Sequence, residues 1–176
     1  MPKAITHDRR LRSARKLLVA FLAETDGLAE KRGPILVQLP PSFAFDRPVV
    51  SSFFRLLRSV YDGLVACEPR HATWFSPAVS LLFDRYRISR VAADPARVPE
   101  ASIPAGWPGL VYFRLHGSPR TYWSRYDEPY IEALAATLAS NGAAQEVWCV
   151  FDNTAAGAAL ENAWELREHL EATRAR

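Results

Sequence analysis

The segment VYFRLHGSP, residues 111–119, ends a strand-like run with two side chains that can do chemistry. Arg114 and His116 are two residues apart, and side chains alternate between the two faces of a β-strand. Both therefore lie on the face that also carries Tyr112, and the alternate residues are apolar and lie on the other face. A guanidinium binds anionic groups, and an imidazole transfers protons near neutral pH. The pattern predicts a small polar or anionic ligand at the end of this strand, with His116 as acid or base.

Four further apolar segments of strand length lead into polar residues in the same way. The five segments begin near residues 34, 64, 90, 110 and 146, and helical patterns separate most of them. This alternation predicts an α/β fold of parallel strands whose carboxyl ends gather at one rim. The polar side chains at those ends are Gln38, Glu68, Arg70, His71, Asp94, Arg114, His116, Asp152 and Asn153, joined by Trp74.

The helices between these segments have recognisable starts. They are predicted over residues 8–31, 46–61, 76–86, 127–142 and 156–172. Asp46, Ser76 and Asp127 stand where an N-cap is expected, and Gly142 is expected to close the fourth helix. Residues 95–109 hold four prolines and two glycines, so no helix is expected there.

Two carboxylates complete the predicted chemistry. Glu68 or Asp94 would orient His116, and both would neutralise Arg70 and Arg114, because unpaired buried charges are costly. The alternative is an interior ion-pair network that binds no ligand.

A metal is a further alternative, because carboxylates and imidazoles from different strand ends can converge on a divalent ion. The residues of suitable type are Glu68, Asp94, His71 and His116. No short spacing between ligands supports such a site, so no metal is predicted. No motif identifies a cofactor, which stays unassigned.

Two segments after the strands offer further contacts. Tyr122 and Tyr126, with Trp123 between them, predict an aromatic wall for a ligand or else a cap on the core. The run NTAAGAALENA, residues 153–163, opens the last helix with small residues, which suit an anion or close packing. The charge of Asp152 disfavours the anion there.

The composition indicates an ordinary globular chain. It has 176 residues, 49% hydrophobic and 23% charged, with a net charge of +3. No signal peptide or membrane span is expected, and we predict a cytoplasmic location. The basic residues at 9–16 precede acidic ones at 24–30, which favours a solvated helix face over contact with nucleic acid. Cys67 and Cys149 are isolated and are expected in the core.

Four segments follow the motifs of a known family in order: GPILVQLPPSF, EPRHATW, YFRLHG with two later tyrosines, and FDNT with a later NA. Through them the chain resembles the YecE-like family (domain of unknown function seventy-two) from about Ala4 to Leu170. The resemblance implies part of a TIM-type β/α barrel as one domain over residues 1–176, and it implies no established activity. The positions that match the family's polar rim are Gln38, Glu68, Arg70, His71, Trp74, Asp94, Arg114, His116, Gly117, Tyr122, Tyr126 and Asn153.

Two features depart from the family pattern. Asp152 stands where the family usually has the first of two asparagines, and the opening GTSGW-like and VEINSSFY-like strands have no counterpart, nor has the strand after them. The chain therefore resembles strands four to eight of a barrel. Open sheet edges invite pairing with another chain, which predicts self-association, low stability, or a start assigned too far downstream.

Three functions follow as alternatives. The first is an enzyme or former enzyme that binds a small polar or anionic ligand at the rim. The second is a degenerate, non-catalytic remnant or interaction module, which the missing strands favour because a barrel site draws on several strand ends. The third is a nucleic-acid-associated module that uses the basic N-terminal helix.

Overall fold

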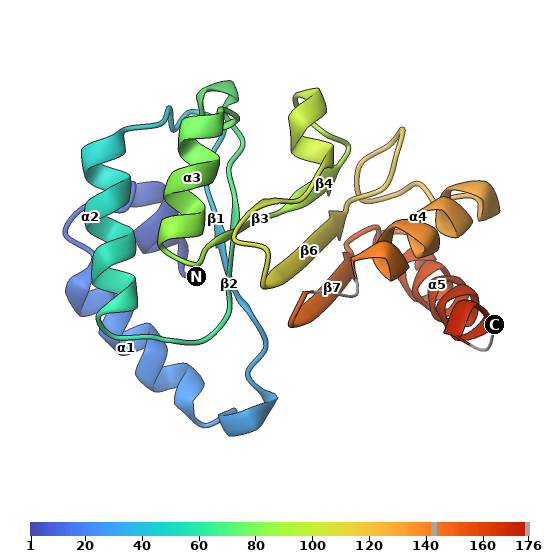
Figure 1. Ribbon diagram of the computed structural model, residues 1–176, viewed down its shortest axis with the longest axis horizontal. Coiled ribbons are helices and arrows are strands. Elements are labelled where there is room, and N and C mark those ends of the chain that lie inside the picture. The colour runs from blue at the N-terminus through green and yellow to red at the C-terminus, as the bar shows by residue number, and fades with distance from the viewer. Residues whose placement is uncertain (142–143, 175–176) are drawn as a thin grey trace. The chain divides into compact units, whose positions relative to one another are not determined.

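The computed structural model describes residues 1–141 and 144–174, and the chain divides into two compact units (Figure 1). Unit 1 comprises Met1–Arg90 with Ala105–Pro108, and unit 2 comprises Val91–Pro104 with Gly109–Arg176. Each unit has its own apolar core and its own sheet.

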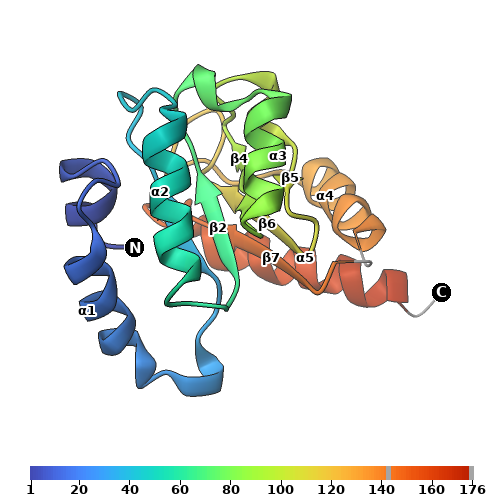
Figure 2. The same ribbon diagram turned by 60° about the vertical axis from the view of Figure 1, so that its left-hand side comes forward.

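Unit 1 contains a four-stranded sheet in the order β1-β2-β3-β5. The first three strands are parallel, and β5 runs antiparallel to β3. Helix α2 connects β1 to β2, and helix α3 connects β2 to β3. Both helices lie on the same side of β1 and β2 in Figure 1, and β2 is seen between them in the view of Figure 2. The bounds are β1 Ile35–Gln38, α2 Arg47–Arg58, β2 Val65–Glu68, α3 Pro77–Arg85, β3 Ser89–Arg90 and β5 Ala105–Gly106.

The predicted starts of α2 and α3 are confirmed. Asp46 accepts a hydrogen bond from the backbone N–H of Val49 at 3.3 Å, and the Ser76 hydroxyl accepts one from Val79 at 3.4 Å. Each such cap stabilises a helix by about 1 kcal/mol. The residues that α2 buries recur at helical spacing and are Val50, Phe53, Phe54 and Leu57.

The single helix predicted over residues 8–31 is confirmed over Arg15–Asp26 and is wrong at both of its ends. This part of the chain forms a π-helical turn η1 (Ala4–Asp8), which ends where the predicted helix begins, then helix α1 (Arg15–Asp26) and a 3₁₀ turn η2 (Ala29–Lys31). Arg10, Leu11 and Ser13 have positive φ angles of 45°, 69° and 48°, which an α-helix cannot contain. Leu11 is buried in the core of unit 1, so its packing overrides the local helical pattern.

Unit 2 contains a parallel three-stranded sheet in the order β4-β6-β7. Helix α4 connects β6 to β7, and α5 follows β7 (Figure 1). Asp127 caps α4 as predicted, since it accepts from the N–H of Tyr130 at 3.1 Å, whereas Gly142 lies outside the described residues. The bounds are β4 Ala92–Asp94, β6 Leu110–Leu115, α4 Glu128–Ser140, β7 Glu146–Phe151 and α5 Ala158–Arg174.

The third predicted strand corresponds to two strands in two sheets. Ser89 and Arg90 pair with β2, whereas Ala92 to Asp94 pair with β6. Within residues 1–141 and 144–174 neither sheet closes on itself, so the observed architecture is mixed α/β, with parallel strands and flanking helices. A helical turn, η4 (Pro99–Ser102), also forms where none was expected, because proline suits a first turn.

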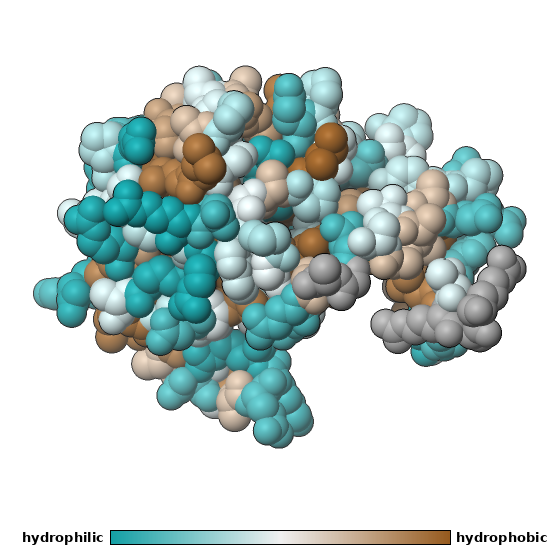
Figure 3. Space-filling model, viewed as in Figure 1, coloured by the Kyte–Doolittle hydropathy of each residue, from teal (hydrophilic) through white to brown (hydrophobic). Residues whose placement is uncertain are grey.

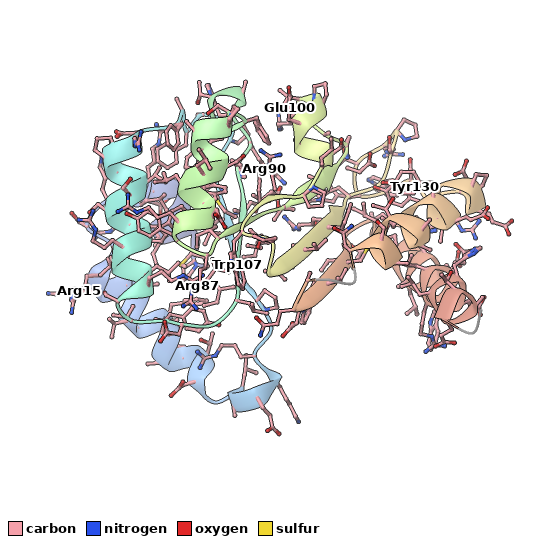
Figure 4. The ribbon with its side chains drawn as sticks, viewed as in Figure 1. Arg15, Arg87, Arg90, Glu100, Trp107 and Tyr130 are labelled. Atoms are coloured by element: carbon pink, nitrogen blue, oxygen red, sulfur yellow. The ribbon has the colours of Figure 1, made fainter. Side chains whose placement is uncertain are left out.

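Polar residues predominate on the face of the protein that Figure 3 shows. In Figure 3 hydrophobic residues form separate brown patches between larger hydrophilic areas. Arg15, labelled in Figure 4, extends away from α1 and is exposed. None of the helices that the structure describes has the length and apolar character needed to cross a bilayer.

Candidate functional site

Strand β6 positions the centre of the candidate site. Val111, Phe113 and Leu115 point into the core of unit 2, where they pack with residues of α4. Arg114 and His116 therefore lie on the opposite face, as the alternation predicted. Their side chains are only 17% and 5% exposed, so two basic groups are largely withdrawn from water at the end of one strand.

Asp152 is a carboxylate that contacts both of these side chains. Its Oδ2 lies 2.7 Å from Nη2 of Arg114 and 3.0 Å from Nδ1 of His116. The role of Glu68 or Asp94 in orienting His116 stays a prediction, whereas Asp152 was predicted as a polar residue of the strand end and as an added negative charge, without a contact to His116. The strand register was the missing signal: Leu115 pairs with Phe151, which places Asp152 beside His116.

Asp94, at the end of β4, contacts Tyr126. The tyrosine hydroxyl donates to Oδ2 of Asp94 at 2.7 Å and accepts from the N–H of Gly117 at 2.8 Å. Burial, and then the hydrogen bond to Asp94, raises the pKa of Tyr126 well above its usual value. The ring stacks on Tyr130 of α4, labelled in Figure 4, with 4.5 Å between ring centroids. Tyr126 thus ties β4, the β6–α4 connection and α4 together.

Asn153 is fully buried after β7 and joins a network of amides. Its Nδ2 donates to the carbonyl of Ser124 at 2.9 Å and to Oδ1 of Asn162 at 3.0 Å. Asn162, in α5, bonds both the N–H and the carbonyl of Tyr126 at 3.0 and 2.9 Å. Among the described residues, Oδ1 of Asn153 has no hydrogen-bond partner. Asn162 was not predicted, and only its place in the NA motif pointed to it.

Gly117 makes the sharp turn after His116. Its φ is +91°, and a Cβ there would lie 2.8 Å from the carbonyl oxygen of Ser124. Only glycine fits both the left-handed backbone and the close approach. The position therefore explains the G of the RLHG motif in structural terms.

Tyr122 is the predicted aromatic residue that reaches His116. Its ring meets the imidazole edge to face, with centroids 5.7 Å apart, and about half of the residue is exposed. Trp123 beside it packs under the guanidinium of Arg120 at 4.2 Å. Tyr122 is thus placed to cover His116, whereas Tyr126 is buried.

A second polar group lies in unit 1, at the ends of β1 and β2. Oε1 of the buried Glu68 accepts from Nε of Arg70 at 2.8 Å and from Nε2 of Gln38 at 3.3 Å. The predicted pairing of Glu68 with Arg70 is therefore observed.

His71 and Trp74 belong to the turn that follows β2. Nδ1 of His71 accepts from the N–H of Thr73 at 3.3 Å and so begins the 3₁₀ turn η3 (Ala72–Trp74). Trp74 is fully buried, and its indole N–H donates to the carbonyl of Phe43 at 2.7 Å. The surroundings of Trp74 are those of a core residue.

No group of three or more His, Cys, Asp or Glu side chains suited to a metal ion occurs in residues 1–141 and 144–174. The described contacts instead gather Arg114, His116 and Asp152 at one point of unit 2 and Gln38, Glu68 and Arg70 at one point of unit 1.

Solved structures share this fold. A DUF72 family protein of Thermotoga maritima superposes with a TM-score of 0.79 and 23% identity, over 97% of this chain and 71% of that one. A DUF72 family protein of Enterococcus faecalis gives a TM-score of 0.74 and 26% identity, over 90% of this chain and 70% of that one. No curated protein matches the sequence.

The sequence itself matches a family over its whole length. The family is described as "Protein of unknown function DUF72", and the match covers residues 1–176. This is the YecE-like family that the motifs resemble. The chain therefore belongs to the DUF72 family.

Proposed function

We propose that the chain binds a small polar ligand with an anionic group at the carboxyl end of β6. Arg114 would contact the anionic group, and His116 would give or take a proton. The observation that carries this proposal is the burial of Arg114 and His116 against one oxygen of Asp152. Withdrawing basic side chains from water is costly, and such clusters are typical of functional sites.

Neighbouring residues of unit 2 support the proposal. Tyr122 would cover the ligand, since its ring already meets that of His116. Asp94 and Asn153 would contribute from the ends of β4 and β7. Tyr126 would act through Asp94, because its hydroxyl is already bonded to that carboxylate.

The polar group of unit 1 is a separate part of the proposal. A polar ligand there would meet the carboxylate of Glu68, the guanidinium of Arg70 and the amide of Gln38. His71 follows in the next turn. We further propose, from the family resemblance, that the strands correspond to part of a TIM-type β/α barrel.

Thermal shift measurements test the ligand site. Inorganic phosphate, sulfate and citrate are the probes, and glucose is the neutral comparison. Arg114→Gln and His116→Gln remove the proposed contacts, whereas Arg125→Gln is a matched control, because Arg125 also pairs with carboxylates, those of Glu161 and Glu165, but on an exposed face.

The proposal expects a saturable rise in the melting temperature of the wild type with at least one anion. A ligand at 100 times its Kd stabilises by about 2.7 kcal/mol. The rise should vanish in Arg114→Gln, shrink in His116→Gln and persist in Arg125→Gln. Equal shifts in all four proteins would overturn the proposal.

An interaction module is the second candidate, and the edge strand β7 favours it. The sheet of unit 2 ends at β7, where Val147 and Trp148 are 38% and 37% exposed. Native sheets usually protect an edge with lysine, proline or a bulge, and EVWCVF carries only Glu146. We propose that a second copy of the chain pairs along this edge.

A further inference from the structure

The backbone of Asp152 is fixed by a hydrogen bond of its own, independently of the contacts that the side chain makes. Its backbone N–H donates to the carbonyl of Leu115 at 2.7 Å, which continues the pairing of β7 with β6 by one residue. The backbone N–H of His116 in turn donates to the carbonyl of Asp94 at 2.7 Å. The carboxylate and the imidazole are therefore fixed by adjoining strands rather than by loops.

We propose that Asp152 is a positioning residue that fixes the tautomer of His116, with the proton on Nδ1 and Nε2 left as the basic nitrogen. The role of that nitrogen in chemistry rests on the proposed function. The tautomer itself does not, because it follows from the contact between Asp152 and His116.

The direction of the hydrogen bond determines the tautomer. A carboxylate at neutral pH only accepts hydrogen bonds, so Nδ1 at 3.0 Å from Oδ2 must carry the hydrogen. In the neutral ring Nε2 then has no proton. Neutral imidazole in water prefers the opposite tautomer, so the carboxylate reverses the intrinsic preference of the ring.

Arg114 strengthens this arrangement. Its Nη2 donates to the same Oδ2 at 2.7 Å, and charge-assisted hydrogen bonds of this kind are short and directional. One oxygen thus orients the guanidinium that would bind an anion and the imidazole that would move a proton. Such support of a functional side chain by a second residue is a common way to hold a site in its productive geometry.

The test is NMR of the protein with ¹⁵N-labelled histidine at about pH 8.5, about two units above the ordinary histidine pKa. The chain has four histidines, and loss of one pattern in His116→Gln assigns the signal of His116. Long-range ¹H–¹⁵N correlations distinguish a protonated from an unprotonated ring nitrogen. We expect Nδ1 protonated and Nε2 unprotonated in the wild type.

Two variants distinguish a role of Asp152 in positioning His116 from a general role in the stability of the fold. Asp152→Asn keeps the shape but lets the side chain accept or donate, so the Nδ1–H pattern should weaken. In Asp152→Ala, the signals of the Nδ1–H tautomer of His116 should be replaced by those of the Nε2–H tautomer. Asp94→Asn is the matched control, because that carboxylate contacts Tyr126, and it should leave the His116 pattern unchanged.

The wild-type spectrum tests the proposal even where a variant fails to fold. A wild-type His116 protonated at Nε2, or at both nitrogens, would overturn the proposal, as would an unchanged pattern in folded Asp152→Ala. No ligand is present in this experiment. A failure of the anion titrations with the Nδ1–H pattern intact would therefore count against the proposed function alone.

Discussion

Replacing Tyr126 with phenylalanine removes one buried hydroxyl together with its hydrogen bonds to Asp94 and Gly117. The bond donated to the Asp94 carboxylate at 2.7 Å is worth about 1.5–3 kcal/mol, and the bond accepted from the Gly117 N–H at 2.8 Å about 0.5–1.5 kcal/mol. The residue is only 3% exposed, so water does not readily replace the lost partners. We expect Tyr126→Phe to lower the free energy of unfolding by about 2–4 kcal/mol.

Urea unfolding followed by far-UV circular dichroism measures this loss. Tyr130→Phe is the control, because its ring stacks on Tyr126 and is half-buried, and it should cost less than about 1 kcal/mol. Two variants that differ by less than about 0.5 kcal/mol would refute the reasoning, since the hydroxyl of Tyr126 would then have no special role.

The same residue predicts the response to alkali. Burial raises the pKa of Tyr126 in the folded protein above the value of about 10 expected in the unfolded chain. The stability due to this group is therefore complete below about pH 10 and is lost as the pH rises toward the folded pKa. Between about pH 9 and 11.5, the free energy of unfolding of the wild type should fall as the pH rises, and that of Tyr126→Phe should fall less steeply. Urea unfolding at a series of pH values measures both, and parallel profiles would contradict this.

Three further predictions concern single positions. Gly117→Ala should lower stability by more than about 1 kcal/mol in urea unfolding, because φ is +91° and a Cβ would lie 2.8 Å from the Ser124 carbonyl; an unchanged midpoint would contradict the geometry. Burial raises the pKa of the Cys149 thiol to about 12, so iodoacetamide at about pH 8 should label it only after unfolding, as mass spectrometry would reveal. Val147→Lys should abolish concentration-dependent association in light scattering, whereas a wild type that is monomeric at all concentrations would exclude pairing at β7.

The sequence predicted best what depends on neighbours along the chain. Asp46, Ser76 and Asp127 cap their helices because a cap needs only a suitable side chain before a helical pattern. The alternation of faces in β6 was equally local, and it placed Arg114 and His116 together on the face opposite Phe113.

Features that depend on contacts between distant parts of the chain were not predicted. The split of the third strand follows from Arg90 pairing with β2 and Ala92 pairing with β6. The role of Asp152 follows from the register of β6 and β7. The break near Leu11 arises because burial of that side chain outweighs the helical pattern around it.

The central claim is that Arg114 and His116 form one ligand-binding group at the end of β6. Titration of the ¹⁵N-labelled protein with inorganic phosphate, followed at the Arg114 Nε–H and at the ring nitrogens of His116, tests it most directly. We predict saturable shifts at both side chains with one common Kd, none at Arg125, and loss of the His116 shifts in Arg114→Gln. Shifts that grow linearly with phosphate, or that are as large at Arg125 as at Arg114, would contradict the claim.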